Sequence, residues 1–89
     1  MNKIVLITTK GCEGCNIMHK NIKQALENTS KKIEYITKDI SDLTKAEKAK
    51  LKSSDFPTIL FVKNNRIVRK EMGTKPYIVV LRWIDVDFK

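Results

Sequence analysis

Cysteine, proline, glycine and tryptophan are scarce in this sequence of 89 residues, which contains two, two, three and one of them. Apolar runs are also short, and none approaches the roughly 20 residues that a membrane-spanning helix needs. The first of these runs, residues 4–7, is followed by no small-residue cleavage site and does not resemble a secretory signal. We therefore expect a cytoplasmic protein without a membrane partner.

Charge of one sign predominates, because 18 Lys and Arg against 10 Asp and Glu give a net charge of +8. Fifteen of the 18 are lysines, spread through every segment, and no basic stripe interleaved with aromatic residues is present. Proteins that bind single-stranded nucleic acid combine both features. We expect a solubilising surface with some electrostatic steering, and no nucleic-acid partner.

The length and the apolar content of 42% suit one core and one domain, residues 1–89, and we expect a monomer. Residues 3–8 are nearly all apolar, which predicts a central strand covered on both faces. Residues 12–28 repeat apolar side chains at spacings of three and four, which predicts a helix with one inward face. That face carries Cys15, Met18, Ile22, Ala25 and Leu26.

The second half of the chain is predicted to form shorter elements. We predict a strand at 33–38, a turn at 39–42, and a lysine-rich helix that begins at a Thr44-to-Glu47 capping box and is broken at 53–55. An apolar strand at 58–63 and an edge strand at 66–72 flank a tight turn at 64–65. A last helix starts at Tyr77, where Tyr77 and Trp83 are expected to pack. The predicted order is β-α-β-α-β-β-α.

The two cysteines, Cys12 and Cys15, are separated by two residues at the start of the first helix. A helix N-terminus favours a thiolate over a thiol, so Cys12 at the tip is the expected nucleophile and Cys15 faces inward. Lys10 should favour the thiolate further, whereas Glu13 should oppose it. Zinc is the alternative, because His19 follows on the same helical face, but a fourth ligand is missing. We expect no metal and a solvated His19.

Two motifs, Cys12-Glu13-Gly14-Cys15 and Phe56-Pro57-Thr58, stand in an element order that resembles the thioredoxin/glutaredoxin family over essentially the whole chain. The resemblance implies an α/β thioredoxin fold, with a mixed four-stranded sheet flanked by helices. It also implies a thiol-disulfide oxidoreductase of electron transport and cell redox homeostasis that reduces protein disulfides. Its redox-active centre would be the Cys12-Cys15 disulfide, with no other cofactor.

The same resemblance implies further site residues. Pro57 would be cis beside the disulfide, with the backbone of Phe56 offered to a substrate chain and Thr58 next to it. Gly73 matches a glycine at the end of the hairpin, and Thr74 follows it. The residues around the cysteines, Lys10, Gly11 and Glu13, complete the expected substrate-binding set.

Three departures from the family leave the electron donor open. Gly11 stands where thioredoxins have Trp, Leu6 stands near the place of their buried acid, and Gly73 is followed by no second glycine or acid of the glutaredoxin type. Either a thioredoxin reductase-like enzyme or a small thiol such as glutathione is the expected donor. The alternative is a thioredoxin-fold module that binds a protein through Phe56 and the basic surface, or binds metal, without significant turnover.

Overall fold

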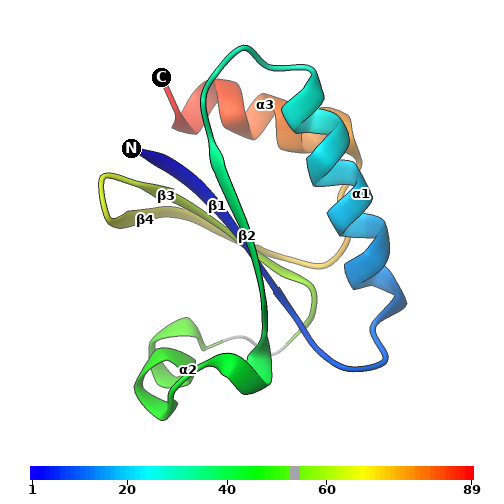
Figure 1. The fold of residues 1–89 in the computed structure, drawn as a ribbon, viewed down its shortest axis with the longest axis vertical. Coiled ribbons are helices and arrows are strands. Elements are labelled where there is room, and N and C mark those ends of the chain that lie inside the picture. Colours follow the sequence, from blue (N-terminus) through cyan, green and yellow to red (C-terminus); the bar gives the residue numbers. More distant parts are fainter. Residues whose placement is uncertain (53–54) are drawn as a thin grey trace.

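The secondary structure follows the predicted order (Figure 1). The structure is a computed structural model that describes residues 1–52 and 55–89. The elements are β1 (Asn2–Thr8), α1 (Glu13–Glu27), β2 (Glu34–Asp39), a 3-10 helix (Ile40–Asp42), α2 (Lys45–Leu51), β3 (Thr58–Lys63), β4 (Arg66–Met72) and α3 (Tyr77–Asp87). The order β-α-β-α-β-β-α is confirmed. Helix α2 ends at Leu51, and the break predicted at Ser53 and Ser54 lies outside the described residues.

The four strands form one mixed sheet in the order β2-β1-β3-β4. β1 pairs in parallel with β2 and antiparallel with β3, so that Ile4 lies between Tyr35 and Phe61. β4 pairs with β3 alone, antiparallel. The central place of β1 and the edge position of β4 are therefore confirmed.

Local signals in the sequence set the turns. Thr44 caps α2: its Oγ1 accepts the amide of Glu47 at 3.1 Å, and the carboxylate of Glu47 accepts the amide of Thr44 at 2.9 Å. Asn64 and Asn65 both have positive φ, 52° and 67°, which suits the tight turn between β3 and β4. The predicted capping box and turn are both confirmed.

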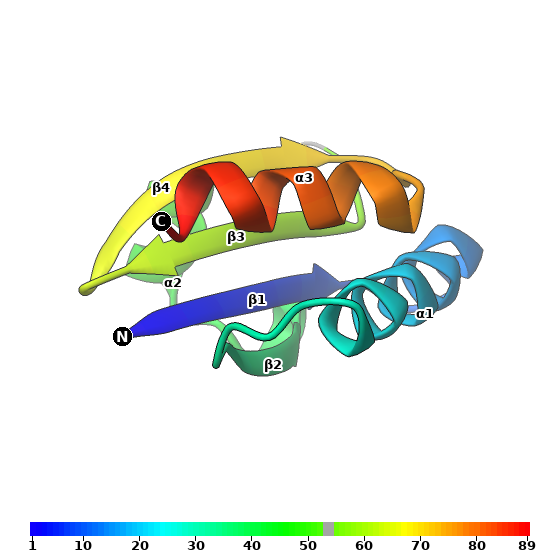
Figure 2. The same ribbon diagram turned by 90° about the horizontal axis from the view of Figure 1, so that it is seen from above.

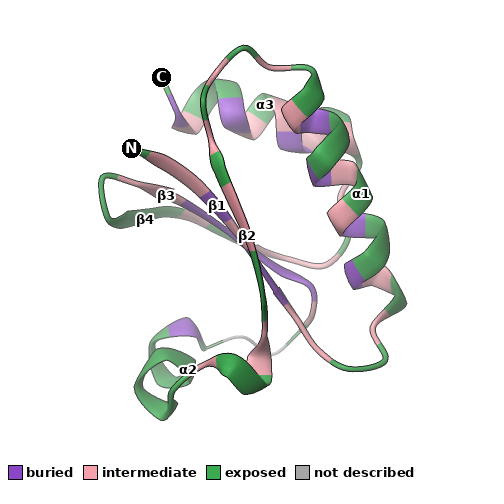
Figure 3. Ribbon diagram, in the orientation of Figure 1, coloured by how far each residue is buried: buried purple, intermediate pink, exposed green. Residues whose placement is uncertain are grey.

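The two faces of the sheet are covered unequally. Helices α1 and α3 lie together on one face (Figure 2). Ile4, Phe61, Met18 and Ile84 are fully buried in the core on this face. Helix α2 lies on the other face, over a smaller cluster of buried residues, Ile7, Leu51 and Leu60. Figure 3 shows buried residues along β1 and β3 and an almost entirely exposed α2. The main core thus holds α1, with its cysteines, against the sheet.

An ion-pair group fastens α3 to the edge of the sheet. The guanidinium of Arg69 donates to Asp87 at 2.6 Å and to Glu71 at 2.9 Å, and it lies 4.9 Å from the centre of the Trp83 ring. Trp83 also meets Phe61 edge-on, so it is a packing residue, as expected. Within residues 1–52 and 55–89, no helix has both the length and the apolar character needed to cross a membrane.

Candidate functional site

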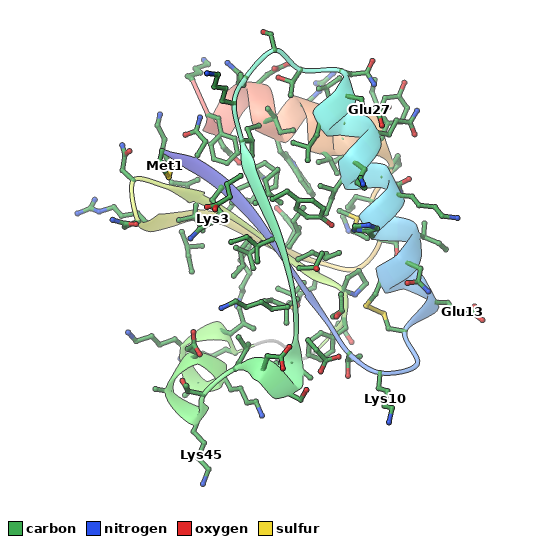
Figure 4. The ribbon with its side chains drawn as sticks, in the orientation of Figure 1. Met1, Lys3, Lys10, Glu13, Glu27 and Lys45 are labelled. Carbon is green, nitrogen blue, oxygen red and sulfur yellow. A yellow bond between two sulfur atoms is a disulfide. The ribbon has the colours of Figure 1, made fainter. Side chains whose placement is uncertain are left out.

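The cysteine pair lies where β1 leads into α1 (Figure 4). Gly11 has a φ of +73°, which a glycine adopts without strain and which turns the chain out of the strand. Cys12 then occupies the N-cap of α1 in an extended conformation. Its Sγ accepts the backbone N–H of Cys15 at 3.0 Å, the bond that an N-cap side chain normally makes. The sulfur of Cys12 therefore satisfies a donor that the helix end leaves free.

Cys12 and Cys15 form a disulfide with a Cα–Cα distance of 5.3 Å. Cys15 is buried, with 4% of its surface exposed, whereas Cys12 is half-buried. The difference follows from the helix, because Cys15 shares the inward face with Met18 and Ile22. Cys12 is therefore the more accessible residue of the pair.

An open, polar hollow of about 440 Å³ lies beside the pair. Thr8, Thr9, Asn16 and Glu13 line it together with Gly11 and the two cysteines. The sequence analysis did not single out Thr8, Thr9 or Asn16 as site residues, although Asn16 directly follows the motif and Thr8 and Thr9 lie four and three positions before Cys12.

Lys10 is one of the residues expected to bind substrate beside the cysteines. It is exposed, does not line the hollow, and points away from the disulfide (Figure 4). Hydrogen bonds from Ser41 and, secondarily, the charge of Lys10 hold the pKa of the Asp39 carboxyl below its usual value. That Lys10 favours the Cys12 thiolate stays a prediction, since the pair is a disulfide in this structure.

Two loops from the second half of the chain meet α1 between the cysteines. The peptide bond between Phe56 and Pro57 is cis, and the carbonyl of Pro57 accepts the amide of Gly73 at 2.8 Å. A Cβ built on Gly14 would lie 2.9 Å from Thr74 Oγ1 and 3.5 Å from Pro57 Cδ. The structure thus brings Pro57, Gly73 and Thr74 to the cysteine motif.

Two members of the expected binding set turn inward. Thr58 is fully buried and its hydroxyl donates to the carbonyl of Asp55 at 2.9 Å, which corrects the expectation that it faces a substrate. The side chain of Phe56 packs against the smaller cluster under α2, on the opposite face of the sheet from the helix that carries the cysteines. Only the backbone of Phe56 stays close to the site, through its bond to Pro57.

Two contacts join α1 to the loop before α3, and sequence reasoning did not find them. The amide of Asn21 donates to the carbonyl of Lys75 at 2.8 Å, and the backbone N–H of Lys75 donates to the sulfur of Met18 at 3.4 Å. These partners are more than 50 positions apart in the chain, so no local pattern could reveal them. They hold the Thr74 loop against the cysteine helix.

His19 is half-buried rather than solvated. Its Nδ1 lies 2.8 Å from the hydroxyl of Tyr35, and the two rings stack with centroids 5.6 Å apart. Burial raises the pKa of Tyr35 to about 12. Among the described residues, no group of three or more His, Cys, Asp or Glu gathers as a metal site. The possible triad of Cys12, Cys15 and His19 is therefore not assembled.

No protein-family model matches the chain, and no curated protein matches it. Solved structures resemble it closely in fold. Thioredoxin-2 of the malaria parasite, a component of its protein secretion machinery, superposes with a TM-score of 0.83 at 15% identity, over 97% of this chain and 82% of that one. Chloroplastic thioredoxin z gives 0.78 at 15% identity, over 97% and 77% of the two chains.

Reduced thioredoxin of Schistosoma mansoni also gives a TM-score of 0.78, at 20% identity, over 96% of this chain and 77% of that one. At these identities the likeness concerns the backbone arrangement. It agrees with the mixed four-stranded sheet and the three α-helices described above. The chain therefore has the thioredoxin fold, with a Cys-x-x-Cys disulfide at the N-terminus of its first helix.

Proposed function

We propose that the protein is a thiol-disulfide oxidoreductase that reduces protein disulfides by dithiol exchange. The observation that carries the proposal is the asymmetry of the pair: the half-buried Cys12 sulfur accepts a helix N-terminal amide at 3.0 Å, while Cys15 is buried beneath it. That amide favours a negatively charged sulfur on Cys12 once the disulfide is reduced. The more accessible, activated sulfur of Cys12 attacks, and the sulfur of the buried Cys15 resolves.

The exchange proceeds in two balanced steps. The Cys12 thiolate attacks one sulfur of the target disulfide, forming a mixed disulfide and releasing the other target sulfur as a thiolate that takes up a proton. Cys15 then loses its proton and attacks Cys12 Sγ, which restores the Cys12-Cys15 bond and releases the second target thiol. Two electrons pass from the protein to the target, and an external thiol or reductase must return them.

The proton of Cys15 needs a route, because Leu6 is apolar and fully buried where a carboxyl would otherwise serve. The polar hollow lined by Thr8, Thr9 and Asn16 reaches both cysteines. Water in this hollow is the proton acceptor that the proposal requires.

The substrate chain is proposed to lie across Cys12, between the Pro57 loop and Thr74. Gly11 and Glu13 border the hollow, and Gly73 holds Pro57 through its amide. We propose protein disulfides as substrates, a cytoplasmic monomer as the working form, and a reductase or glutathione as the electron donor.

Insulin reduction tests this proposal. Purified protein is assayed with dithiothreitol, with thioredoxin reductase and NADPH, and with glutathione and its reductase. Cys12→Ser should abolish turnover, whereas Cys15→Ser should accumulate a mixed disulfide with the target on non-reducing gels. In the reduced protein, alkylation near neutral pH should label Cys12 before Cys15.

The donor that supports turnover identifies the subclass. A rate no higher than that of dithiothreitol alone, and none with either enzymatic donor, would favour the binding module instead. Equal alkylation of both cysteines would contradict the assigned roles of Cys12 and Cys15.

A further inference from the structure

The face of the sheet that carries α2 has a groove that the disulfide chemistry does not use. The seven-residue helix α2 covers only part of this face, leaving an open cleft of about 260 Å³ between the helix and the strands. None of the residues lining this cleft lines the hollow at the cysteines. The groove and the hollow at the cysteines therefore have no lining residue in common.

Apolar side chains form the floor and walls of the groove. All four strands and the α2 region contribute, and the deepest members belong to the smaller buried cluster. The apolar lining residues are Val5, Ile7, Ile36, Leu43, Leu51 and Leu60. Ile67 of β4 adds an apolar edge and is 60% exposed. This surface gains free energy when an apolar ligand displaces water from it.

Cationic side chains border this apolar surface. Lys3, Lys38 and Lys50 line the groove, and Glu47 is the single acidic residue among them. The carboxylate of Glu47 accepts the amide of Thr44, and this hydrogen bond, together with the nearby charge of Lys38, lowers its pKa. Within residues 1–52 and 55–89, none of the three ammonium groups forms a salt bridge or donates a hydrogen bond to a protein group. The groove thus combines an apolar floor with an excess of positive charge, since three lysines face one carboxylate.

These features favour one kind of occupant over the others. A second copy of the chain would bring two lysine borders together, and each copy carries a net charge of +8. The volume lies just below the range of about 300–1,000 Å³ that drug-sized ligands fill, so it suits a single slender chain. A carboxylate at the end of that chain would meet the lysines.

We propose that this groove binds a small amphipathic anion, an aliphatic chain of medium length that ends in a carboxylate. The chain lies over the β1 and β3 side chains under α2, and the head group lies among Lys3, Lys38 and Lys50. The proposal does not depend on disulfide exchange.

Decanoate is the probe, titrated by calorimetry below its micelle concentration. Decanol and decyltrimethylammonium have the same chain length without the negative charge. We expect saturable binding of one decanoate, at least about tenfold weaker binding of either analogue, and weakening by added salt.

Matched variants test the lysine border. Lys3→Glu/Lys38→Glu/Lys50→Glu should weaken decanoate binding by at least about tenfold. The control, Lys20→Glu/Lys23→Glu/Arg82→Glu, makes the same change of net charge at exposed positions of α1 and α3, on the opposite face, and should keep most of the affinity.

The apolar edge has its own pair of variants, in case the charge variants fold poorly. Ile67→Ser should weaken binding about threefold or more. Val68→Ser, 46% exposed at the next position of β4 and outside the groove, should leave it unchanged. Circular dichroism and thermal unfolding verify that each variant is folded.

The proposal would be overturned by the absence of saturable decanoate binding, by equal affinity for all three probes, or by equal losses in test and control variants. Binding to anionic lipid vesicles without binding of monomeric decanoate would also overturn it, because the groove would then act as a membrane-facing surface.

Discussion

Gly14, between the two cysteines, is the position where a single methyl group tests the geometry of the site. A Cβ there would lie 2.9 Å from Thr74 Oγ1, closer than carbon and oxygen normally approach, and 3.5 Å from Pro57 Cδ, an ordinary contact. The conflict is therefore with Thr74. Gly14→Ala should push the Thr74 loop away from α1, which Asn21 and Met18 resist through their bonds to Lys75.

Two opposing terms set the magnitude. Replacing a helical glycine by alanine stabilises a fold by about 0.5–1 kcal/mol, and Gly14 has no positive φ that would cancel this gain. Overpacking costs about 1–3 kcal/mol. Gly14→Ala should therefore range from neutral to about 2.5 kcal/mol destabilising. With Thr74→Ala, which removes Oγ1, only the helical gain should remain.

A double-mutant cycle measures the difference. Urea unfolding of the wild type, Gly14→Ala, Thr74→Ala and the double variant should give a coupling of about 1–3 kcal/mol. Insulin reduction should fall in Gly14→Ala and recover in the double variant. If Gly14→Ala stabilises the protein equally with Thr74 or Ala at position 74, within about 0.5 kcal/mol, the close approach does not exist.

Three further predictions concern stability. The fold raises the pKa of Tyr35 to about 12 by burial, so the native state keeps a proton that the unfolded state loses above about pH 10. Stability should fall as the pH rises through that window, by about 1 kcal/mol after discounting for solvent exposure. Urea unfolding should show this loss in the wild type and not in Tyr35→Phe; equal losses would contradict the assignment. Arg69→Met leaves the carboxylate of Asp87, 10% exposed, without its partner, and should cost about 2 kcal/mol in urea unfolding, whereas Glu71→Gln, at a more exposed carboxylate, should cost less than about 1. Similar costs would refute this ranking. Gly11→Ala should lower thermal stability by about 1 kcal/mol from backbone strain alone, since no atom lies within 4 Å of the new Cβ; a neutral result would show that the loop relaxes.

The sequence predicted the elements well because their signals are local. The apolar pattern of β1, the three- and four-residue spacing in α1 and the capping box at Thr44 each depend on residues a few positions apart. The position of Cys12 at a helix tip and of Cys15 on the inward face follows from the same periodicity. Placing the hairpin and Pro57 beside the cysteines required the family resemblance.

The sequence did not predict the contacts that form only when the sheet brings distant segments of the chain together. The approach of Thr74 to Gly14, the bond from Asn21 to Lys75 and the pairing of His19 with Tyr35 join residues on different elements. Side-chain orientation also depends on backbone turns, and Lys10, next to the turn at Gly11, does not line the hollow at the cysteines.

The chain by itself thus determined a strand, a Cys-x-x-Cys at a helix start, and the order of the elements that follow, since these arise from local periodicity and capping. Tertiary structure alone decided which loops border the disulfide and where Phe56 packs. It also decided that a short α2 leaves a lysine-bordered groove on one face of the sheet. Those features depend on the order of the strands in the sheet and on how much of the sheet α2 is long enough to cover. No single segment of the sequence carries that information.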